Sequence, residues 1–426
     1  MKTVPDDAPA APTADRVPTS VPVSAGIVCA LVGFTSSFAV VLAGLRAVGA
    51  SPAQAASGLV AVSIAMGAAS VLLSWRTRMP ITCAWSTPGA ALLVSIGAVA
   101  GGWPAAVGAF AVCAVLLVAT GLWPALARLV TRIPPAVAQA MLAGVLLPLC
   151  IAPVTALADD PPVIAPVLLT WVVLLALRPR WAVPGAFVAA LAVIAVTLIG
   201  HDDVPPPSAW IPHLELTAPA LTPQALTGIA LPLYIVTMAA QNIPGVAVLG
   251  GFGYRAPWRA ALSTTGLGSL LGTVFGGHAI NLAAISAALA AGPDAGPDPA
   301  RRWVAGVSTG VAYLGLGLVS TGLCAAVLAA PAGLVQAVAG VALLGAFAGA
   351  CAGALAAESD RIPAAVTLVV AASGTTLVGI GAAFWALAAG VVAHRLLRPS
   401  TREKPTDAAA GNDTTGNDTA GNDIGK

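Results

Sequence analysis

Long apolar stretches, each without a formal charge in its middle, constrain this chain more than any other feature of its sequence. Of the 426 residues, 58% are hydrophobic and 8% are charged, whereas a soluble domain has about 25% charged residues. Every Lys, Arg, Asp and Glu falls in an expected loop, a helix end or a terminal tail. Uncharged stretches of this length are typical of membrane-spanning helices. The sequence therefore predicts an all-α polytopic membrane protein.

The apolar stretches divide the chain into fourteen expected membrane spans. Two of them, 80–97 and 278–291, are short, as expected of a half-helix preceded by extended chain. The stretch 363–378 is also short and is either tilted or re-entrant. In chain order the fourteen spans are 24–46, 53–75, 80–97, 103–123, 134–157, 161–178, 182–200, 225–250, 257–275, 278–291, 303–328, 332–356, 363–378 and 380–397.

The distribution of basic residues supports this layout, because short cytoplasmic loops carry an excess of Lys and Arg. The opposite loops contain one basic residue, Arg46, and carry the acidic residues Asp159, Asp160, Asp202, Asp203 and Glu215. Seven spans per half make the second half inverted relative to the first, and both termini are expected to be cytoplasmic. The arginines that share the cytoplasmic side are Arg76, Arg78, Arg128, Arg132, Arg178, Arg180, Arg255, Arg259, Arg301, Arg302, Arg361, Arg395, Arg398 and Arg402.

The spans and tails divide the chain into five expected parts. Residues 1–22 are Pro-rich and residues 398–426 are low-complexity and polar, so both predict disordered cytoplasmic tails. The first inverted repeat is expected at 23–200, an external loop at 201–224 and the second repeat at 225–397. No organellar presequence is recognisable, so we expect a multi-pass protein of the cytoplasmic (inner) membrane.

Two short segments break otherwise apolar spans with polar and helix-breaking residues. They are PITCAWSTPGAALL at Pro80–Leu93 and FGGHAINLAAISAAL at Phe275–Leu289, each third among the spans of its half. Interrupted helices at corresponding positions of two halves indicate the substrate site of a secondary transporter built from inverted repeats. Pro and Gly are also common in ordinary membrane helices, where a lone break is more often a kink. The matched positions favour a transport site.

These two segments, together with LPLYIVTMAAQNIPGVAVL at Leu231–Leu249, resemble the signature stretches of the benzoate/proton symporter (BenE-type) family. The similarity runs through about 24–397. It implies a 7+7 inverted-repeat fold similar to nucleobase permeases, in which spans 1–4 and 8–11 form a core and spans 5–7 and 12–14 form a gate. It also implies import of an aromatic carboxylate coupled to protons.

The first broken segment has the chemistry of a helix start. Pro88 suits the first turn of a helix, and Ser86 or Thr87 would be its N-cap. Free backbone N–H groups at residues 89–91 would then carry the positive end of the helix dipole to the bilayer midplane. Such an end binds an anion, and no lysine or arginine is needed to hold a carboxylate.

The second broken segment repeats this arrangement with different residues. Gly276 and Gly277 free the backbone for a turn, and Asn281 is expected to cap a helix through LAAISAALA. In the eighth span, the adjacent amides of Gln241 and Asn242 face either a cavity or a neighbouring helix, since unpaired polar groups in hydrocarbon are costly. The nucleobase permeases typically have a carboxylate where this chain has Gln241, and the neutral amide favours an anionic substrate.

An aromatic substrate also needs an apolar or stacking wall. Trp85 and Phe275 flank the two breaks and are the candidates, although ordinary packing explains either of them equally well. We interpret four other tryptophans near the expected interfaces, Trp103, Trp123, Trp171 and Trp181, as residues of the interfacial belt.

A proton carrier is harder to identify, because no carboxylate lies in the middle of a span. His278 is near the expected site and titrates in the physiological range, although it equally well hydrogen-bonds the turn. Glu358 lies at the inner end of the twelfth span, where a solvated ion pair is the commoner meaning of such a residue. The alternative is that the substrate binds with its own proton.

We therefore expect a secondary importer of benzoate or a similar aromatic carboxylate by proton symport. The alternatives are a proton-coupled transporter of another small anion or a nucleobase-like compound, and a passive anion channel. The chain has no nucleotide loop, metal cluster or catalytic triad, so we expect no enzyme and no cofactor. The expected partners are the substrate, protons and the lipid bilayer, without nucleic acid, and small-residue surfaces on the gate spans would allow a homodimer. The residues expected to bind substrate are Trp85, Ser86, Thr87, Gly89, Ala90, Gln241, Asn242, Phe275, Gly277, Ile280, Asn281 and Leu282.

Overall fold

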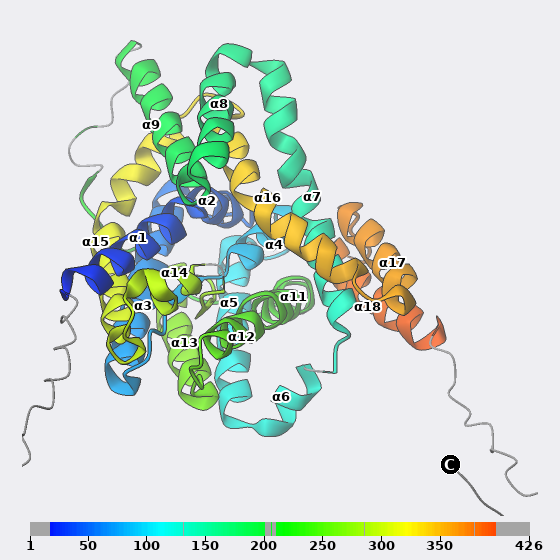
Figure 1. The fold of residues 1–426 in the computed structure, drawn as a ribbon. Helices are drawn as coiled ribbons and strands as arrows, with labels where there is room; N and C mark the ends of the chain where they lie inside the picture. The colour runs from blue at the N-terminus through cyan, green and yellow to red at the C-terminus, as the bar shows by residue number, and fades with distance from the viewer. Residues whose placement is uncertain are drawn as a thin grey trace, which may run out of the picture.

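The computed structural model describes residues 18–130, 132–200, 206, 210–284, 286–378 and 380–397 (Figure 1). The expected C-terminal tail and residues 1–17 of the expected N-terminal tail lie outside these ranges. The first helix begins at Ser20, so residues 20–22 are helical and do not belong to a tail. Residues 201–205 and 207–209 of the expected external loop also lie outside the described residues.

The first half forms helices in every stretch where a span is expected. Its first span is broken at Ser36 and Ser37 into two helices, and its third consists of a short strand followed by a helix. The elements are α1 (Ser20–Thr35), α2 (Phe38–Ala47), α3 (Pro52–Thr77), β1 (Cys83–Trp85), α4 (Thr87–Ile96), α5 (Gly102–Leu122), α6 (Pro124–Val130), α7 (Pro135–Asp159), α8 (Pro161–Leu177) and α9 (Ala182–Gly200).

The second half has the same order of a long span, a helix, a strand with a helix, and further helices. Its first stretch contains two π-helical turns, at Leu226–Ala230 and Met238–Asn242. The stretch 363–378 is helical only in part, since its helix ends at Ala372. The elements are α10 (Pro223–Ala225), α11 (Leu231–Thr237), α12 (Ile243–Gly251), α13 (Trp258–Thr273), β2 (Ile280–Leu282), α14 (Ala287–Ala291), α15 (Trp303–Leu328), α16 (Leu334–Leu355), α17 (Arg361–Ala372) and α18 (Ala382–Leu397).

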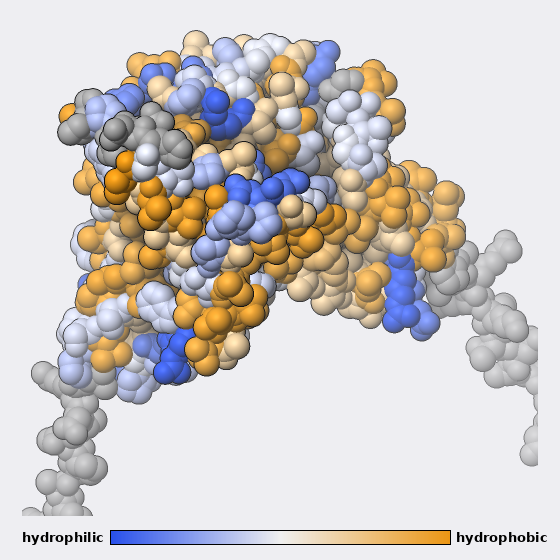
Figure 2. Space-filling view, turned by 90° about the horizontal axis from the view of Figure 1, so that it is seen from above, coloured by the Kyte–Doolittle hydropathy of each residue, from blue (hydrophilic) through white to orange (hydrophobic). Residues whose placement is uncertain are grey.

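The composition of these helices suits a membrane. Eight helical stretches of the described chain are long and apolar enough to cross a membrane, and three shorter helices are similarly apolar. Figure 2 shows apolar side chains over much of the visible surface, with hydrophilic residues gathered in separate patches. Helices satisfy their own backbone hydrogen bonds, which lipid cannot do. The protein is a helical polytopic membrane protein, as the sequence predicts.

The two broken segments meet as a short antiparallel ribbon. β1 pairs with β2 in the register Cys83 with Leu282, Ala84 with Asn281 and Trp85 with Ile280. Two further backbone hydrogen bonds extend the ribbon beyond both strands, from Ser86 N to Ala279 O and from Ala283 N to Thr82 O, each 2.9 Å long. Non-helical backbone at membrane depth must find partners within the protein. Each broken segment therefore supplies the partners of the other.

The helices pack in two bundles, which Figure 1 shows with α7, α8, α9, α16, α17 and α18 above and to the right of the others. In the first bundle, α3 packs on α15, α5 on α13, α1 on α15 and α2 on α4. In the second bundle, α7 packs on α16 and α17, α17 on α18 and α8 on α9. Between the bundles, α2 contacts α16 and α4 contacts α7.

The segment 210–222 crosses the first bundle. Thr217 donates its backbone N–H to the Val274 carbonyl at 2.8 Å and accepts a hydrogen bond from the Trp103 indole at 3.0 Å. Trp103 is thus buried in the bundle, and the prediction that it belongs to an interfacial belt is wrong. The segment closes this end of the bundle through backbone as well as side-chain contacts.

Glycines allow α3 and α15 to approach closely. A Cβ atom at Gly67 would lie 2.8 Å from the Gly310 carbonyl oxygen, and one at Gly310 would lie 2.5 Å from the Gly67 carbonyl oxygen. Because interhelical packing in membranes depends on close backbone approach at small residues, this reciprocal contact fixes the distance between the two helices.

Gly310→Ala is expected to destabilise the protein, because the added carbon collides with the α3 backbone at Gly67. Gly315→Ala on the same helix is the matched control, since a Cβ there meets nothing within 4 Å. Overpacking costs about 1–3 kcal/mol, so the thermal unfolding midpoint in detergent should fall for Gly310→Ala and not for Gly315→Ala. Equal midpoints for the two variants would contradict the close packing.

Candidate functional site

A cavity of about 680 Å³ lies between the two bundles. The lining at the start of α4 and at the break between α1 and α2 is buried, with Trp85 1% and Ser37 6% exposed, and we call this part the closed end. The lining also includes Arg180, in the turn between α8 and α9, whose side chain is 56% exposed, and we call this part the mouth. Most of its wall is apolar. The polar side chains that line it are Ser36, Ser37, Thr87, Gln139, Arg180, Gln241 and Ser286.

Hydroxyl groups gather at the closed end of the cavity. Thr87 donates its hydroxyl to Ser37 Oγ at 2.7 Å, and Ser36 Oγ lies 3.4 Å from Ser37 Oγ. The two serines occupy the break between α1 and α2 and were missed by the sequence reasoning. The signal is the run Thr35-Ser36-Ser37 within an apolar span. This run itself contains neither the Pro nor the Gly that marks the other breaks.

The start of α4 has the predicted cap but lacks the predicted free donors. Ser86 is the N-cap, and its Oγ accepts the Gly89 N–H at 3.2 Å and shares a hydrogen bond with Thr237 Oγ1 at 2.8 Å. The Ala90 N–H donates to the Ser86 carbonyl at 2.8 Å. The expectation of free N–H groups at Gly89 and Ala90 is therefore wrong, and the cavity at this helix start is lined by Thr87 and Pro88.

Adjacent amides in the π-helical turn Met238–Asn242 have different surroundings. The Gln241 side chain lines the cavity and, within the described chain, its amide forms no hydrogen bond with protein. Asn242 is fully buried: its Oδ1 accepts the Leu282 N–H at 3.0 Å and its Nδ2 lies 3.5 Å from Met238 Sδ. The sequence left open whether these amides face a cavity or a neighbouring segment. Gln241 faces the cavity, and Asn242 bonds to a neighbouring segment. Such π-helical turns are frequent at functional sites.

Most of the expected site residues of the second broken segment lie behind the cavity, although Ala283, Ala284 and Ser286 of that segment line it. Asn281 pairs with Ala84 in the ribbon, and its amide, oriented to satisfy both groups, donates to the Leu282 carbonyl at 2.9 Å and accepts from Ser86 N at 3.3 Å. The prediction that Asn281 caps a helix is wrong, because strand pairing continues to Leu282 and α14 begins only at Ala287. Three other expected site residues, Gly277, Ile280 and Leu282, are also buried away from the cavity.

Aromatic side chains form part of the cavity wall. Trp85 and Trp171 line it, and the Trp85 ring lies 5.1 Å from that of Phe34, which is itself 5.3 Å from Phe38. Trp171 is thus a cavity residue, not the belt residue that we expected. Phe275 lies in a separate apolar groove between α3 and α13, so the prediction that it forms part of the substrate wall is wrong.

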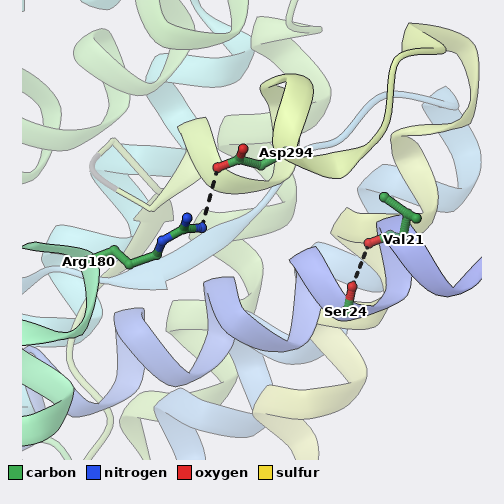
Figure 3. A network of polar contacts seen from close by, with 4 residues as sticks. All are labelled: Val21, Ser24, Arg180 and Asp294. Carbon is green, nitrogen blue, oxygen red and sulfur yellow. Dashed lines mark hydrogen bonds and ion pairs between the residues drawn. The ribbon is translucent and has the colours of Figure 1, made fainter. Parts of the chain in front are cut away.

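Charge is confined to one end of the cavity. Among the described residues that line it, Arg180 alone is charged, and its Nη1 lies 3.7 Å from Asp294 Oδ2 (Figure 3). His278 is fully buried outside the cavity, with Nε2 3.3 Å from the Ser86 carbonyl oxygen. Glu358 lies at the surface in an exposed ion pair with Arg361 at 3.7 Å. In the described part of the chain, no group of three or more His, Cys, Asp or Glu side chains is placed to hold a metal ion.

Solved structures with a similar fold are membrane transporters. The transmembrane domain of a cyanobacterial bicarbonate transporter, BicA, aligns with a TM-score of 0.55 and 17% identity over 87% of this chain and 97% of that domain. The murine anion transporter Slc26a9, in its inward-facing state, aligns with a TM-score of 0.60 and 12% identity over 89% of this chain and 68% of that chain. At these identities the likeness concerns the fold alone, which this chain shares with those transporter domains.

The chain belongs to the benzoate membrane transport protein (BenE) family, whose profile matches residues 17–396. It is 37% identical to the inner membrane protein YdcO of Escherichia coli over 88% of this chain and 95% of that protein. It is 28% identical to a benzoate membrane transport protein of Acinetobacter baylyi over 88% of this chain and 94% of that protein. The resemblance found in the sequence motifs is confirmed.

Asn242→Leu is expected to destabilise the fold by about 1–3 kcal/mol, because the buried Leu282 N–H loses its acceptor. Gln241→Leu is the matched control: the same change one residue earlier removes an amide that faces the cavity. We expect a lower thermal unfolding midpoint in detergent for Asn242→Leu alone. An equal loss for both variants would mean that the Gln241 amide also holds the fold.

Proposed function

We propose that the protein imports benzoate or a similar aromatic carboxylate together with protons across the inner membrane, by alternating access. The observation that carries this proposal is the closed end of the cavity, where hydroxyl and amide groups lie beside aromatic rings. A volume of about 680 Å³ is within the usual range for small-molecule sites. The family membership and the likeness to anion transporter folds support the same class of substrate.

Neutral donors suit a carboxylate in this setting. The Gln241 amide and the hydroxyls of Ser36, Ser37 and Thr87 can donate to a carboxylate, whereas a glutamate at position 241 would repel it. The apolar wall beside Trp85 and Trp171 suits an aromatic ring. We assign the substrate site to this end of the cavity. The remaining residues of the expected site, in the ribbon and at the start of α4, position these groups.

The packing of the helices supports a 7+7 inverted repeat with fourteen spans. The second span of each half packs on the fourth span of the other, as α3 does on α15 and α13 on α5. The fifth spans, α7 and α16, pack on each other. This reciprocity is what two related halves facing each other produce. In this proposal the first bundle is the core and the second bundle is the gate.

The position of the cavity mouth supports one conformational state of the transport cycle. The mouth contains Arg180, which we assign to the cytoplasmic side because short cytoplasmic loops carry an excess of arginine. At the other end of the core, residues 210–222 cover the bundle and are bonded to it. We therefore infer an inward-facing state with both termini cytoplasmic. A rocking or sliding motion of core against gate would open the site to the opposite side.

His278 is the proposed proton carrier. Its Nε2 contacts the carbonyl of Ser86, the residue before the cavity-lining Thr87, and within the described chain its buried Nδ1 has no hydrogen-bond partner. A buried polar atom without a partner calls for an explanation such as transient protonation. Glu358 is omitted from this role because its exposed pair with Arg361 lies outside the cavity.

Two alternatives follow from the same cavity. Another small anion or a nucleobase-like compound would use the same donors, and competition against benzoate separates these ligands. A passive anion channel would equilibrate its ion without accumulating it, so uptake against a concentration gradient excludes that alternative.

Gln241→Glu is expected to lower benzoate uptake by about fivefold or more, because a unit charge facing the carboxylate at about 4 Å costs between about 1 and 4 kcal/mol. The assay is uptake of radiolabelled benzoate into proteoliposomes under an inward proton gradient, with and without a protonophore. Gln336→Glu is the matched control, since Gln336 is exposed in the first turn of α16.

Absence of uptake by the wild type would overturn the benzoate assignment. Accumulation that persists with the protonophore would overturn proton coupling. Equal uptake by Gln241→Glu and Gln336→Glu would place the substrate elsewhere.

His278→Gln is expected to abolish proton-driven accumulation while benzoate exchange across the membrane persists. Glutamine preserves a donor to the Ser86 carbonyl but does not titrate. The measurement compares gradient-driven uptake with counterflow in liposomes preloaded with unlabelled benzoate. Unchanged gradient-driven uptake by a folded His278→Gln protein would show that the proton travels elsewhere, for instance on the substrate itself.

A further inference from the structure

Arg180 occupies a distinctive place in the cavity. It is the one charged side chain among the described lining residues, and its side chain is 56% exposed, whereas the hydroxyls of Ser37 and Thr87 are part-buried. It belongs to the gate bundle, in the 3₁₀ turn Pro179–Trp181 between α8 and α9. A substrate anion in this cavity therefore has one guanidinium within the described lining that it can meet.

The partner of Arg180 comes from the other bundle. Asp294 lies in the turn Pro293–Ala295 that follows α14, and Figure 3 shows the two side chains reaching toward each other across the boundary. The Nη1 to Oδ2 distance is 3.7 Å, and the side chains are 56% and 62% exposed. This separation is too long for a hydrogen bond. Asp294 therefore balances the charge of Arg180 without using its N–H donors.

The loop that carries Asp294 is fixed by hydrogen bonds from Arg302. Arg302 is buried and donates from Nη1 to the Ala291 carbonyl at 2.9 Å and from Nε to the Gly296 carbonyl at 2.8 Å. These bonds hold both ends of the turn against the first bundle. In the same region the Ser24 hydroxyl donates to Val21 of its own helix at 2.9 Å and takes no part in the ion pair.

We propose that Arg180 is a second, transient binding residue for the substrate carboxylate at the cavity mouth, and that Asp294 competes with the substrate for it. This inference rests on the proposed function. The planar guanidinium presents several donors that match a carboxylate in two-point contact. An exposed ion pair is weak and is screened by salt, so an arriving carboxylate replaces Asp294 at little cost. When the carboxylate leaves, Asp294 takes its place again.

The alternative is that the ion pair only holds core and gate together. Neutralising Arg180 and neutralising Asp294 should change the Kd for benzoate in opposite directions if Arg180 binds the substrate, and in the same direction if the pair is such a clasp. Benzoate binding to the purified protein in detergent is measured by titration calorimetry for wild type, Arg180→Gln, Arg180→Lys and Asp294→Asn. We expect Arg180→Gln to raise Kd about 2- to 5-fold and Asp294→Asn to lower it by a similar factor, since an exposed pair is involved. Arg180→Lys should fall between wild type and Arg180→Gln, and the differences should shrink in high salt.

Three outcomes would overturn the inference. Shifts of Kd in the same direction for Arg180→Gln and Asp294→Asn would identify the pair as a clasp that sets the conformation. Unchanged Kd values in both variants, with benzoate bound by the wild type, would show that the carboxylate does not contact Arg180 while the proposed function stands. Absence of benzoate binding by the wild type would overturn the proposed function and this inference with it.

Discussion

Backbone hydrogen bonding between the two broken spans is the interaction on which the rest of this structure depends. Within a bilayer, a strand with an unpaired edge would leave several N–H and C=O groups without partners. The pairing of Cys83–Trp85 with Ile280–Leu282 removes that cost from both segments at once. It also decides which side chains reach the cavity. Trp85 lines the cavity, while Asn281 is held within the ribbon.

The site keeps neutral groups at its closed end and charge at its mouth. Buried charge is costly unless paired, whereas hydroxyls and amides satisfy one another at little cost when the site is empty. The bond from Thr87 to Ser37 is one such contact. An anion that enters can take over donors of this kind, and no fixed cation has to be buried when it leaves. Arg180 keeps its charge where solvent can reach it.

The sequence predicted the helical membrane fold well, because charge placement and apolar length directly reflect the cost of burying charge in lipid. It also predicted the two broken spans and a cap at Ser86 or Thr87, of which the structure has Ser86, since Pro and Gly mark such breaks locally. One error is local, because Ser86 accepts the N–H groups of Gly89 and Ala90 within the same turn. Most of the others concern contacts between segments that are distant in the chain. Asn281 has the composition of a cap, and only its pairing with Ala84 makes it a strand residue. The direction of Phe275 and the role of Ser37 likewise depend on neighbours that spacing alone does not identify.

The ribbon also has a consequence for how the protein is made. Its first strand lies at residues 83–85 and its second at residues 280–282, so most of the chain must be synthesised before they can pair. Until then the first strand sits in or near the bilayer without its permanent partner. The insertion machinery, a neighbouring helix or water at the interface must shelter it during that time. A first half made alone would therefore leave the ribbon edge of its third span without its native partner.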